Sequence, residues 1–209
     1  MARSQTNPAQ DWRDGFLFLG NQLALDFLNT RPVLDGVPTE LLPDFNILLR
    51  WFKAAGLIAS GDMARLEREW TDVKRMQHVL LEMQEFRETL RRAVIHWEES
   101  GTVAQATIAD INRLLADHPM RTRMKVSQRR SQIEQYFNLA QPEDLFAPIA
   151  SSAAALFAGV DHRRVRKCAQ CVLHFQDTSK KGTRRWCSMQ LCGNRQKVAA
   201  YAARQRRTR

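Results

Sequence analysis

The four cysteines of the chain lie close together, in a spacing that suits a metal ion. Cys168 and Cys171 form a Cys-x-x-Cys pair. After fifteen intervening residues, Cys187 and Cys192 form a second pair with four residues between them. A Cys-x-x-Cys turn presents two thiolates to one side, and a second pair can complete a tetrahedron around Zn²⁺. The sequence therefore predicts one structural zinc ion bound by Cys168, Cys171, Cys187 and Cys192.

Disulfide formation, redox activity and a catalytic zinc site are less favoured for these cysteines. Disulfides are rare in a reducing cytoplasm, and a thioredoxin-type redox pair would need a strand before Cys168 and a helix after Cys171, and would leave the second pair idle. His174 could be a fifth donor, but four thiolates already close the tetrahedron. A closed Cys₄ site has no vacant position for water, so no hydrolytic role is expected for the metal.

The segments around the cysteines predict a treble-clef-like finger. The first pair should lie on a turn that leads into a short hairpin, with residues 172–175 on one limb, Gly182 near the bend and Trp186 on the return limb. Ser188 is a good N-cap for a helix that runs from Met189 to about Arg206.

The second cysteine pair fits this helix start. Two cysteines five residues apart on one regular helix would point about 140° away from each other. Cys187 should therefore stand just before the helix, and Cys192 should lie in its first turn.

The charge of the chain is concentrated in the same region. The net charge is +10, but residues 162–209 contain fourteen Lys and Arg and a single acid, Asp177, which gives +13. Residues 1–161 have 18 bases and 21 acids, which gives −3. A charge run is often only a solvated surface. Here, however, the basic residues belong to a unit that the metal is expected to hold in one arrangement, which favours a polyanion as the partner.

The predicted partner is DNA, with structured RNA as the alternative. Cations replace counterions along a phosphate backbone, and Arg and Asn can also pair with guanine and adenine at base edges in the major groove. Asn194 and Arg195 are the candidates for base-edge contacts. The predicted nucleic-acid-binding residues are Lys180, Lys181, Arg184, Arg185, Asn194, Arg195, Lys197 and Arg204.

Residues 1–160 predict a mainly helical domain, and residues 161–209 form the finger. Residues 1–14 are polar and expected to be frayed. The fold class is α+β, with one small β element in the N-terminal domain. Hydrophobic periodicity and turn residues predict helices at 22–29, 43–56, 104–116 and 145–159, two helices within 62–99 joined near 74–78, and a β-hairpin of 120–126 and 133–139 packed on the helices.

Two polar residues, Asp26 and Asn29, stand within the apolar segment 16–30. Buried polar side chains usually bond to backbone groups, which is the plainer interpretation. The alternative is a ligand pocket, because pockets use a few polar groups among apolar ones. A catalytic role for this pair with His78, His96 or His118 has no supporting spacing, so no enzymatic activity is expected.

Two motifs resemble known families. Trp186-Cys-Ser-Met-x-x-Cys-Gly-Asn-Arg195-x-Lys197, after Cys168-x-x-Cys171, resembles the CGNR zinc finger. Leu19-Gly-Asn-Gln-Leu-Ala-Leu-Asp-Phe-Leu-Asn-Thr30 resembles the opening of the ABATE domain, which accompanies that finger. The resemblance implies a bacterial stress-induced transcription regulator whose finger binds zinc and DNA. All four ligand positions are present, as are Gly193, Asn194 and Arg195.

The remaining expectations concern location and the role of the N-terminal domain. The chain lacks a run of eighteen apolar residues and the apolar core of a signal peptide, so a cytoplasmic protein without membrane contact is expected. The N-terminal domain is expected to sense a small-molecule effector or to form a homodimer, because one small finger gives limited specificity. The alternatives are an RNA-binding protein, or an enzymatic N-terminal domain with the finger as a structural staple.

Overall fold

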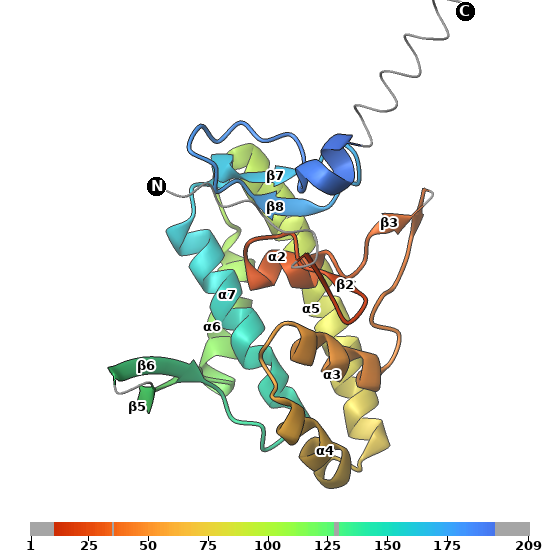
Figure 1. Cartoon of the computed structure of the whole chain (residues 1–209), viewed down its shortest axis with the longest axis vertical. Coiled ribbons are helices and arrows are strands. Elements are labelled where there is room, and N and C mark those ends of the chain that lie inside the picture. The colour runs from red at the N-terminus through yellow and green to blue at the C-terminus, as the bar shows by residue number, and fades with distance from the viewer. Residues whose placement is uncertain (1–10, 35, 128–129, 195–209) are drawn as a thin grey trace, which may run out of the picture.

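A helical body carries a small finger at one end (Figure 1). The computed structural model describes residues 11–34, 36–127 and 130–194. The predicted α+β class, with a mainly helical domain and a Cys₄ finger, is confirmed. The helices of the body are α2 (Leu23–Leu28), α3 (Phe45–Ala54), α4 (Ser60–Glu69), α5 (Val73–Ser100), α6 (Gln105–Asp117) and α7 (Phe146–Gly159).

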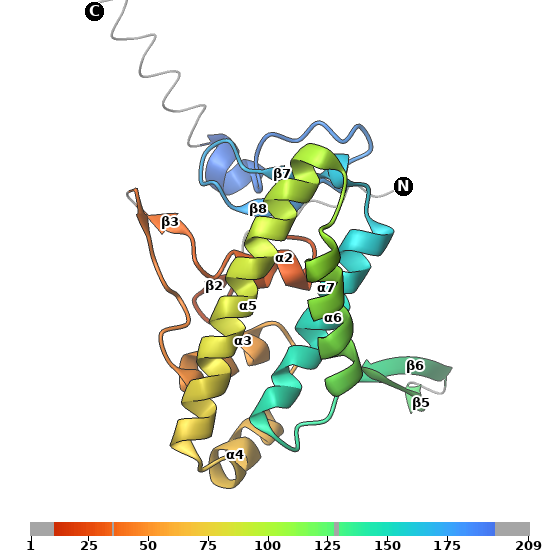
Figure 2. The same cartoon turned by 180° about the vertical axis from the view of Figure 1, so that it is seen from behind.

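The long helix α5 forms the back of the body, beside α6 (Figure 2). Asp72 caps its first turn, since the Asp72 carboxylate accepts a hydrogen bond from the Arg75 amide at 3.0 Å. Gly101 ends it in the left-handed conformation, at φ 72°. The two predicted helices within 62–99 are confirmed as α4 and α5, but the predicted joint at 74–78 is wrong. The chain breaks at residues 70–72 because Asp72 is the N-cap.

Helix α7 packs against α2 and α6. It follows the 3-10 turn η1 (Pro142–Leu145), where Gln141 and Asp144 form a capping box. Its buried face includes Ala150 and Ala153, whose small side chains allow close helix packing. The predicted helix at 145–159, which begins near a proline, is confirmed.

An aromatic cluster around Trp51 connects α3 with α2. The Trp51 side chain is fully buried, and its ring lies 5.3–5.8 Å from the rings of Phe18, Phe27 and Phe52. Such pairs add stabilisation beyond the burial of their area. This cluster fixes the position of α2, which also contacts the finger.

The first described residues form a short hairpin. Strand β1 (Trp12–Arg13) pairs with β2 (Phe16–Leu17), and Asp14 and Gly15 form the turn with positive φ. Asp11 is buried, and its carbonyl accepts a hydrogen bond from the Phe18 amide at 2.8 Å. The prediction that residues 1–14 are frayed is therefore wrong for 11–14. A second short hairpin, β3 (Val33–Leu34) with β4 (Val37–Pro38), follows α2.

The predicted hairpin after α6 is confirmed, but its packing is not. Strands β5 (Arg121–Ser127) and β6 (Arg130–Tyr136) pair in antiparallel register, with Met124 opposite Ile133. The two strands extend away from the helices (Figures 1 and 2). Met124, Val126 and Ile133 are 75–77% exposed. The alternation of apolar residues correctly indicated strands, but no helix of the body covers their apolar face in the described structure.

The finger elements are the 3-10 turn η2 (His162–Arg164), strands β7 (Val165–Lys167) and β8 (His174–Gln176), and the π-helical turn η3 (Met189–Gly193). Strand β8 contacts α2, and η2 contacts α5. The finger therefore rests on the body through two of its helices. Across the described ranges, no helix has both the length and the apolar character needed to cross a bilayer.

Candidate metal centre

The first cysteine pair lies at the tip of the β7–β8 hairpin. Cys168 follows β7 directly, and its amide donates to the Leu173 carbonyl at 2.8 Å. The Val172 amide donates to the Cys168 carbonyl at 3.2 Å, with Val172 held at φ 56°. A β-branched residue rarely adopts this conformation, so the tight turn stores strain that the surrounding contacts must hold.

The predicted course of the chain after this turn is partly wrong. Strand β8 pairs with β7, which precedes the cysteines, and not with a return limb near Trp186. Residues 177–188, all described, contain no strand. In this loop, backbone groups form hydrogen bonds with the side chains of Arg164, Arg166 and Asp177 in place of strand pairing.

The second cysteine pair has the predicted arrangement. The Ser188 hydroxyl accepts a hydrogen bond from the Leu191 amide at 3.4 Å, so Ser188 is the N-cap. Cys187 precedes it, and the Cys192 amide donates to the Ser188 carbonyl at 3.0 Å within η3. The cap brings the two sulfur atoms to 3.7 Å. The part of the predicted helix beyond residue 194 lies outside the described residues.

The four sulfur atoms form a cluster of the right size for zinc. All lie within 4.8 Å of one another, and the Cys171 and Cys187 sulfurs are 3.4 Å apart. A tetrahedron with Zn–S bonds of about 2.3 Å has edges of about 3.8 Å. The cysteines form no disulfide. The predicted ligand set fits one structural zinc ion, which supplies folding energy at this site.

The thiols also require a cation on electrostatic grounds. Hydrogen bonds that the Cys187 thiol donates to the Cys168 and Cys171 sulfurs, together with burial, raise the pKa of Cys187. Burial and the neighbouring Cys171 raise the pKa of Cys192 to about 12. Four thiolates this close repel one another, so all four can be deprotonated only around a positive ion.

A small apolar cluster surrounds the metal ligands. Leu173 and Phe175 of the finger are buried against Cys168, Cys187 and Cys192. Leu19, which comes from the N-terminal domain, belongs to the same cluster. The finger is too small to bury a large core, so the metal and the contact with the body together stabilise it.

Arginine side chains hold the loop between the cysteine pairs. The buried Asp177 carboxylate accepts hydrogen bonds from the Ser179 and Arg184 amides at 2.9 and 2.8 Å. Burial opposes its ionisation, but these hydrogen bonds prevail and lower the pKa of Asp177. The guanidiniums of Arg164 and Arg166 donate to the Ser179 and Gly182 carbonyls at 2.6 and 2.7 Å.

The predicted nucleic-acid-binding residues divide into three groups. Arg184 is half-buried; its guanidinium donates to the Cys187 carbonyl and lies 5.2 Å from the Phe175 ring centre. Lys180, Lys181, Arg185 and Asn194 are exposed. Arg195, Lys197 and Arg204 lie outside the described residues.

Asn29 joins the N-terminal domain to the finger. Its side-chain amide donates to the His174 carbonyl at 2.8 Å, and its carbonyl oxygen accepts from the His174 amide at 2.9 Å. Both groups are buried. The Asn29 side chain thus pairs with the β8 backbone as a neighbouring strand would. This agrees with the prediction that buried polar residues in this segment bond to backbone groups.

Asp26 supports the same contact from within α2. Its carboxylate accepts a hydrogen bond from the Gly20 amide at 2.7 Å, and the Gly20 carbonyl accepts from the Gln176 amide at 2.8 Å. Gly20 has no substitute here, since a Cβ would lie 2.7 Å from the Leu25 Cβ. Burial raises the pKa of Asp26 to about 7 despite the Gly20 bond.

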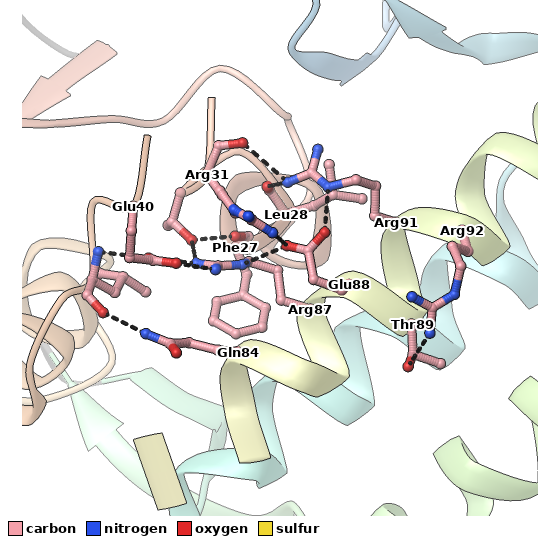
Figure 3. Close-up of polar contacts among 12 residues, drawn as sticks. Phe27, Leu28, Arg31, Glu40, Gln84, Arg87, Glu88, Thr89, Arg91 and Arg92 are labelled. Carbon is pink, nitrogen blue, oxygen red and sulfur yellow. Dashed lines mark hydrogen bonds and ion pairs between the residues drawn. The ribbon is translucent and has the colours of Figure 1, made fainter. Parts of the chain in front are cut away.

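Two arginines of α5, the buried Arg87 and the half-buried Arg91, hold α2 in place, a feature that was not predicted from the sequence (Figure 3). Arg87 is 1% exposed, forms an ion pair with Glu40 and donates to the Thr30 hydroxyl at 2.8 Å. The Arg91 guanidinium donates to the Leu28 carbonyl at 2.6 Å, at the end of α2. An arginine in the apolar stripe of α5 was the available signal, since a buried cation needs a partner.

The histidines considered as catalytic candidates lie apart from these residues. His78 is near Glu82 on α5, His96 is near Thr102 just after α5, and His118 is near Asp144 before α7. None of these contacts involves Asp26 or Asn29. His174 is buried and faces Glu98, with 3.6 Å between its Nε2 and the carboxylate.

An apolar cavity of about 350 Å³ lies where the finger meets the body. Its walls include Phe16, Leu19 and Trp51 from the body and Leu173 and Leu191 from the finger. Asn29 is part of its lining, whereas Asp26 is not. The alternative interpretation from the sequence was a ligand pocket at Asp26 and Asn29, and the contribution of the finger to the cavity was not predicted.

Comparison with protein families supports both parts of the chain. Residues 21–160 match the ABATE model, described as "Putative stress-induced transcription regulator". Residues 164–205 match the CGNR zinc finger. A search of curated proteins gives no significant match.

Proposed function

Because the chain belongs to the ABATE family, we propose that it regulates transcription by binding duplex DNA through its zinc finger. The observation that carries the proposal is the +13 charge of residues 162–209, of which +7 falls on the described residues 162–194, a unit held by four cysteines. A rigid array of cations matches the regular charge of a duplex better than a flexible tail does.

The loop arginines and the exposed cations have different tasks in this proposal. Arg164, Arg166 and Arg184 donate to backbone carbonyls of the finger and shape its loop. Lys180, Lys181 and Arg185 are exposed on that loop. We assign the first group to positioning and the second to phosphate contacts. Asn194, exposed at the end of η3, is the described candidate for a base-edge contact, and Arg195, Lys197 and Arg204 follow it in sequence.

A salt titration of DNA binding tests the proposal. The zinc-loaded protein should bind random duplex DNA with an affinity that falls steeply with salt, and chelation of the zinc should abolish the binding. Replacing Lys180 and Lys181 by Ala should reduce the salt slope by up to about 1.8, at roughly 0.9 for each lost phosphate contact. Lys74→Ala, at an exposed position on α5, is the matched control and should leave the slope unchanged.

Other outcomes would favour the alternatives. Preference for duplex RNA over DNA of the same sequence would indicate an RNA-binding protein, since phosphate attraction alone does not distinguish the two. Failure to bind either duplex, with zinc still present, would make the finger a structural staple. The search for function, including an enzymatic one, would then move to the N-terminal domain.

The exposed hairpin β5–β6 supports a second element of the proposal, homodimerisation. Residues 121–136 contain five bases and one acid, which gives +4, so the other residues of 1–161 carry 13 bases and 20 acids, which gives −7. On the hairpin, Glu134 pairs with Arg123 and Lys125. Its apolar residues Met124 and Ile133 stay exposed. Exposed apolar groups of this kind mark protein contacts.

We therefore propose that the hairpin of one copy packs on the acidic helical body of a second copy. A dimer would present two fingers to one duplex, which raises specificity. Sedimentation analysis should give a dimer for the natural protein and a monomer for the double variant Met124→Glu and Ile133→Glu. Val37→Glu, also at an exposed apolar position, should remain dimeric. A natural protein that stays monomeric at high concentration would refute this element.

A further inference from the structure

The cavity between the finger and the body has the composition of a small-molecule site. We propose that it binds an uncharged, mainly apolar molecule, and that this molecule holds the finger in its docked position. The effector role rests on the proposed function, whereas the binding itself does not depend on any nucleic acid.

Asn29 and Thr30, two polar side chains of the cavity wall, already have partners, whereas the buried indole Nε1 of Trp51 has no hydrogen-bond partner in the described structure. Both polar atoms of the Asn29 amide bond to the backbone of His174. The Thr30 hydroxyl donates to the Phe27 carbonyl at 2.7 Å and accepts from Arg87 at 2.8 Å. Among the described lining residues there is no Asp, Glu, Lys, Arg or His. The wall also includes the metal ligands Cys171 and Cys192. A charged ligand would lose its hydration with the Trp51 N–H as the one buried, unpaired side-chain donor among the described lining residues, so the site selects for an uncharged, mainly apolar molecule.

The shape of the walls narrows the ligand class. Three aromatic side chains, Trp12, Phe16 and Trp51, line the side formed by the body. Aromatic faces pack well against planar rings. A volume of about 350 Å³ lies at the lower end of the range for small-molecule pockets. A bicyclic or tricyclic aromatic molecule, or an aliphatic one of similar size, fits these limits.

The position of the cavity links ligand binding to the finger. Leu173 and Leu191 belong to the finger, whereas Leu17 and Trp51 belong to the body. The cavity exists only while the two parts are docked. A ligand that contacts both walls therefore stabilises the docked state by mass action. Ligand binding and finger docking are coupled because the ligand can touch both walls only when the finger is docked.

A neutral fluorescent probe tests the binding. N-phenyl-1-naphthylamine should bind the zinc-loaded protein at one saturable site, with increased and blue-shifted emission. Leu17→Trp, which adds an indole at a half-buried wall position, should weaken binding at least tenfold. Val37→Trp adds the same group at a 63% exposed position outside the cavity and should bind like the natural protein. Absence of saturable binding to the natural protein, or equal binding by all three, would overturn the proposal.

Hydrogen exchange on the natural protein tests the coupling without any variant. The amides of His174 and Gln176 are held by Asn29 and Gly20, so they report undocking of the finger. At a free probe concentration 100 times its Kd, their exchange should slow by about 100-fold where exchange requires undocking. The amides that pair β5 with β6 should be unaffected. Probe binding without slower exchange at His174 and Gln176 would overturn the coupling. Neither result depends on whether the finger binds DNA.

Discussion

The hairpins β7–β8 and β5–β6 are both two-stranded and antiparallel, yet different forces hold them. Strand β8 is buried against α2, and its backbone forms hydrogen bonds with the Asn29 side chain. The tip of the β7–β8 hairpin carries the metal ligands Cys168 and Cys171. Strands β5 and β6 expose their apolar face and have their own cross-strand ion pairs. An isolated two-stranded hairpin is marginal in water. The first hairpin is thus a stabilised structural unit, and the second is a surface suited to a partner.

Loss of one zinc ligand should have the largest effect, and should affect the two hairpins differently. Cys187→Ala removes one thiolate, so the protein should lose its zinc and the order of the finger. Structural zinc binding contributes about 10–16 kcal/mol in zinc-finger peptides. Zinc analysis and hydrogen exchange would show a metal-free protein with an unprotected His174 amide and an unchanged β5–β6 hairpin. Ser188→Ala, which removes the adjacent cap and the hydrogen bond from the Ser188 hydroxyl to the Asp11 carboxylate, should cost about 2 kcal/mol and retain the metal.

The pH dependence of stability should come next in size and should follow Asp26. Burial raises its pKa from 3.8 to about 7, so the folded state binds more protons than the unfolded state between these values. Stability should therefore fall as the pH rises from about 4 to about 7, by up to about 4 kcal/mol. Denaturant unfolding at a series of pH values measures this fall. Asp26→Asn should flatten the curve in that window, and an equally steep curve would assign the effect elsewhere.

The sequence predicted the metal site well because its information is local. The spacing of the cysteines and the cap at Ser188 determine the arrangement of the sulfur atoms with little help from the rest of the chain. The strand partner of β8 was predicted wrongly, because Val172 takes a left-handed conformation that its residue type does not suggest.

The contact between finger and body could not be predicted, since it depends on residues far apart in sequence. Asn29 and His174 are 145 positions apart, and Arg87 reaches Thr30 across 57 positions. The pattern of polar residues in an apolar segment indicated that Asn29 was buried, but not its partner. Likewise, alternation in 121–136 predicted the strands, whereas the absence of a covering helix is a property of the whole fold.

Asn29→Ala should cause a smaller loss that is confined to the docked hairpin. It leaves the buried amide and carbonyl of His174 without a partner, which costs about 2–6 kcal/mol when each unsatisfied group costs about 1–3. Denaturant unfolding and the exchange rate of the His174 amide measure the loss. Gln22→Ala removes a partly buried bond to the Gln176 side chain and should cost less than about 1 kcal/mol. Equal costs for the two variants would mean that Asn29 does not hold the finger.

The smallest effect on stability should come from substitutions in the exposed hairpin β5–β6. They test whether its apolar face contributes to the stability of the monomer. Ile133 is 77% exposed, whereas Leu173 is 8% exposed. Ile133→Ser should change the free energy of unfolding by less than about 0.5 kcal/mol, as surface substitutions do. Leu173→Ala should cost about 2–5 kcal/mol, because it leaves a cavity beside the metal ligands. The measurements belong at protein concentrations low enough to keep the chain monomeric, since dimerisation would add stability through Ile133. A loss above about 2 kcal/mol for Ile133→Ser in the monomer would mean that β5–β6 packs on its own body. The hairpin would then resemble β7–β8, and its apolar face would not be available to a second copy.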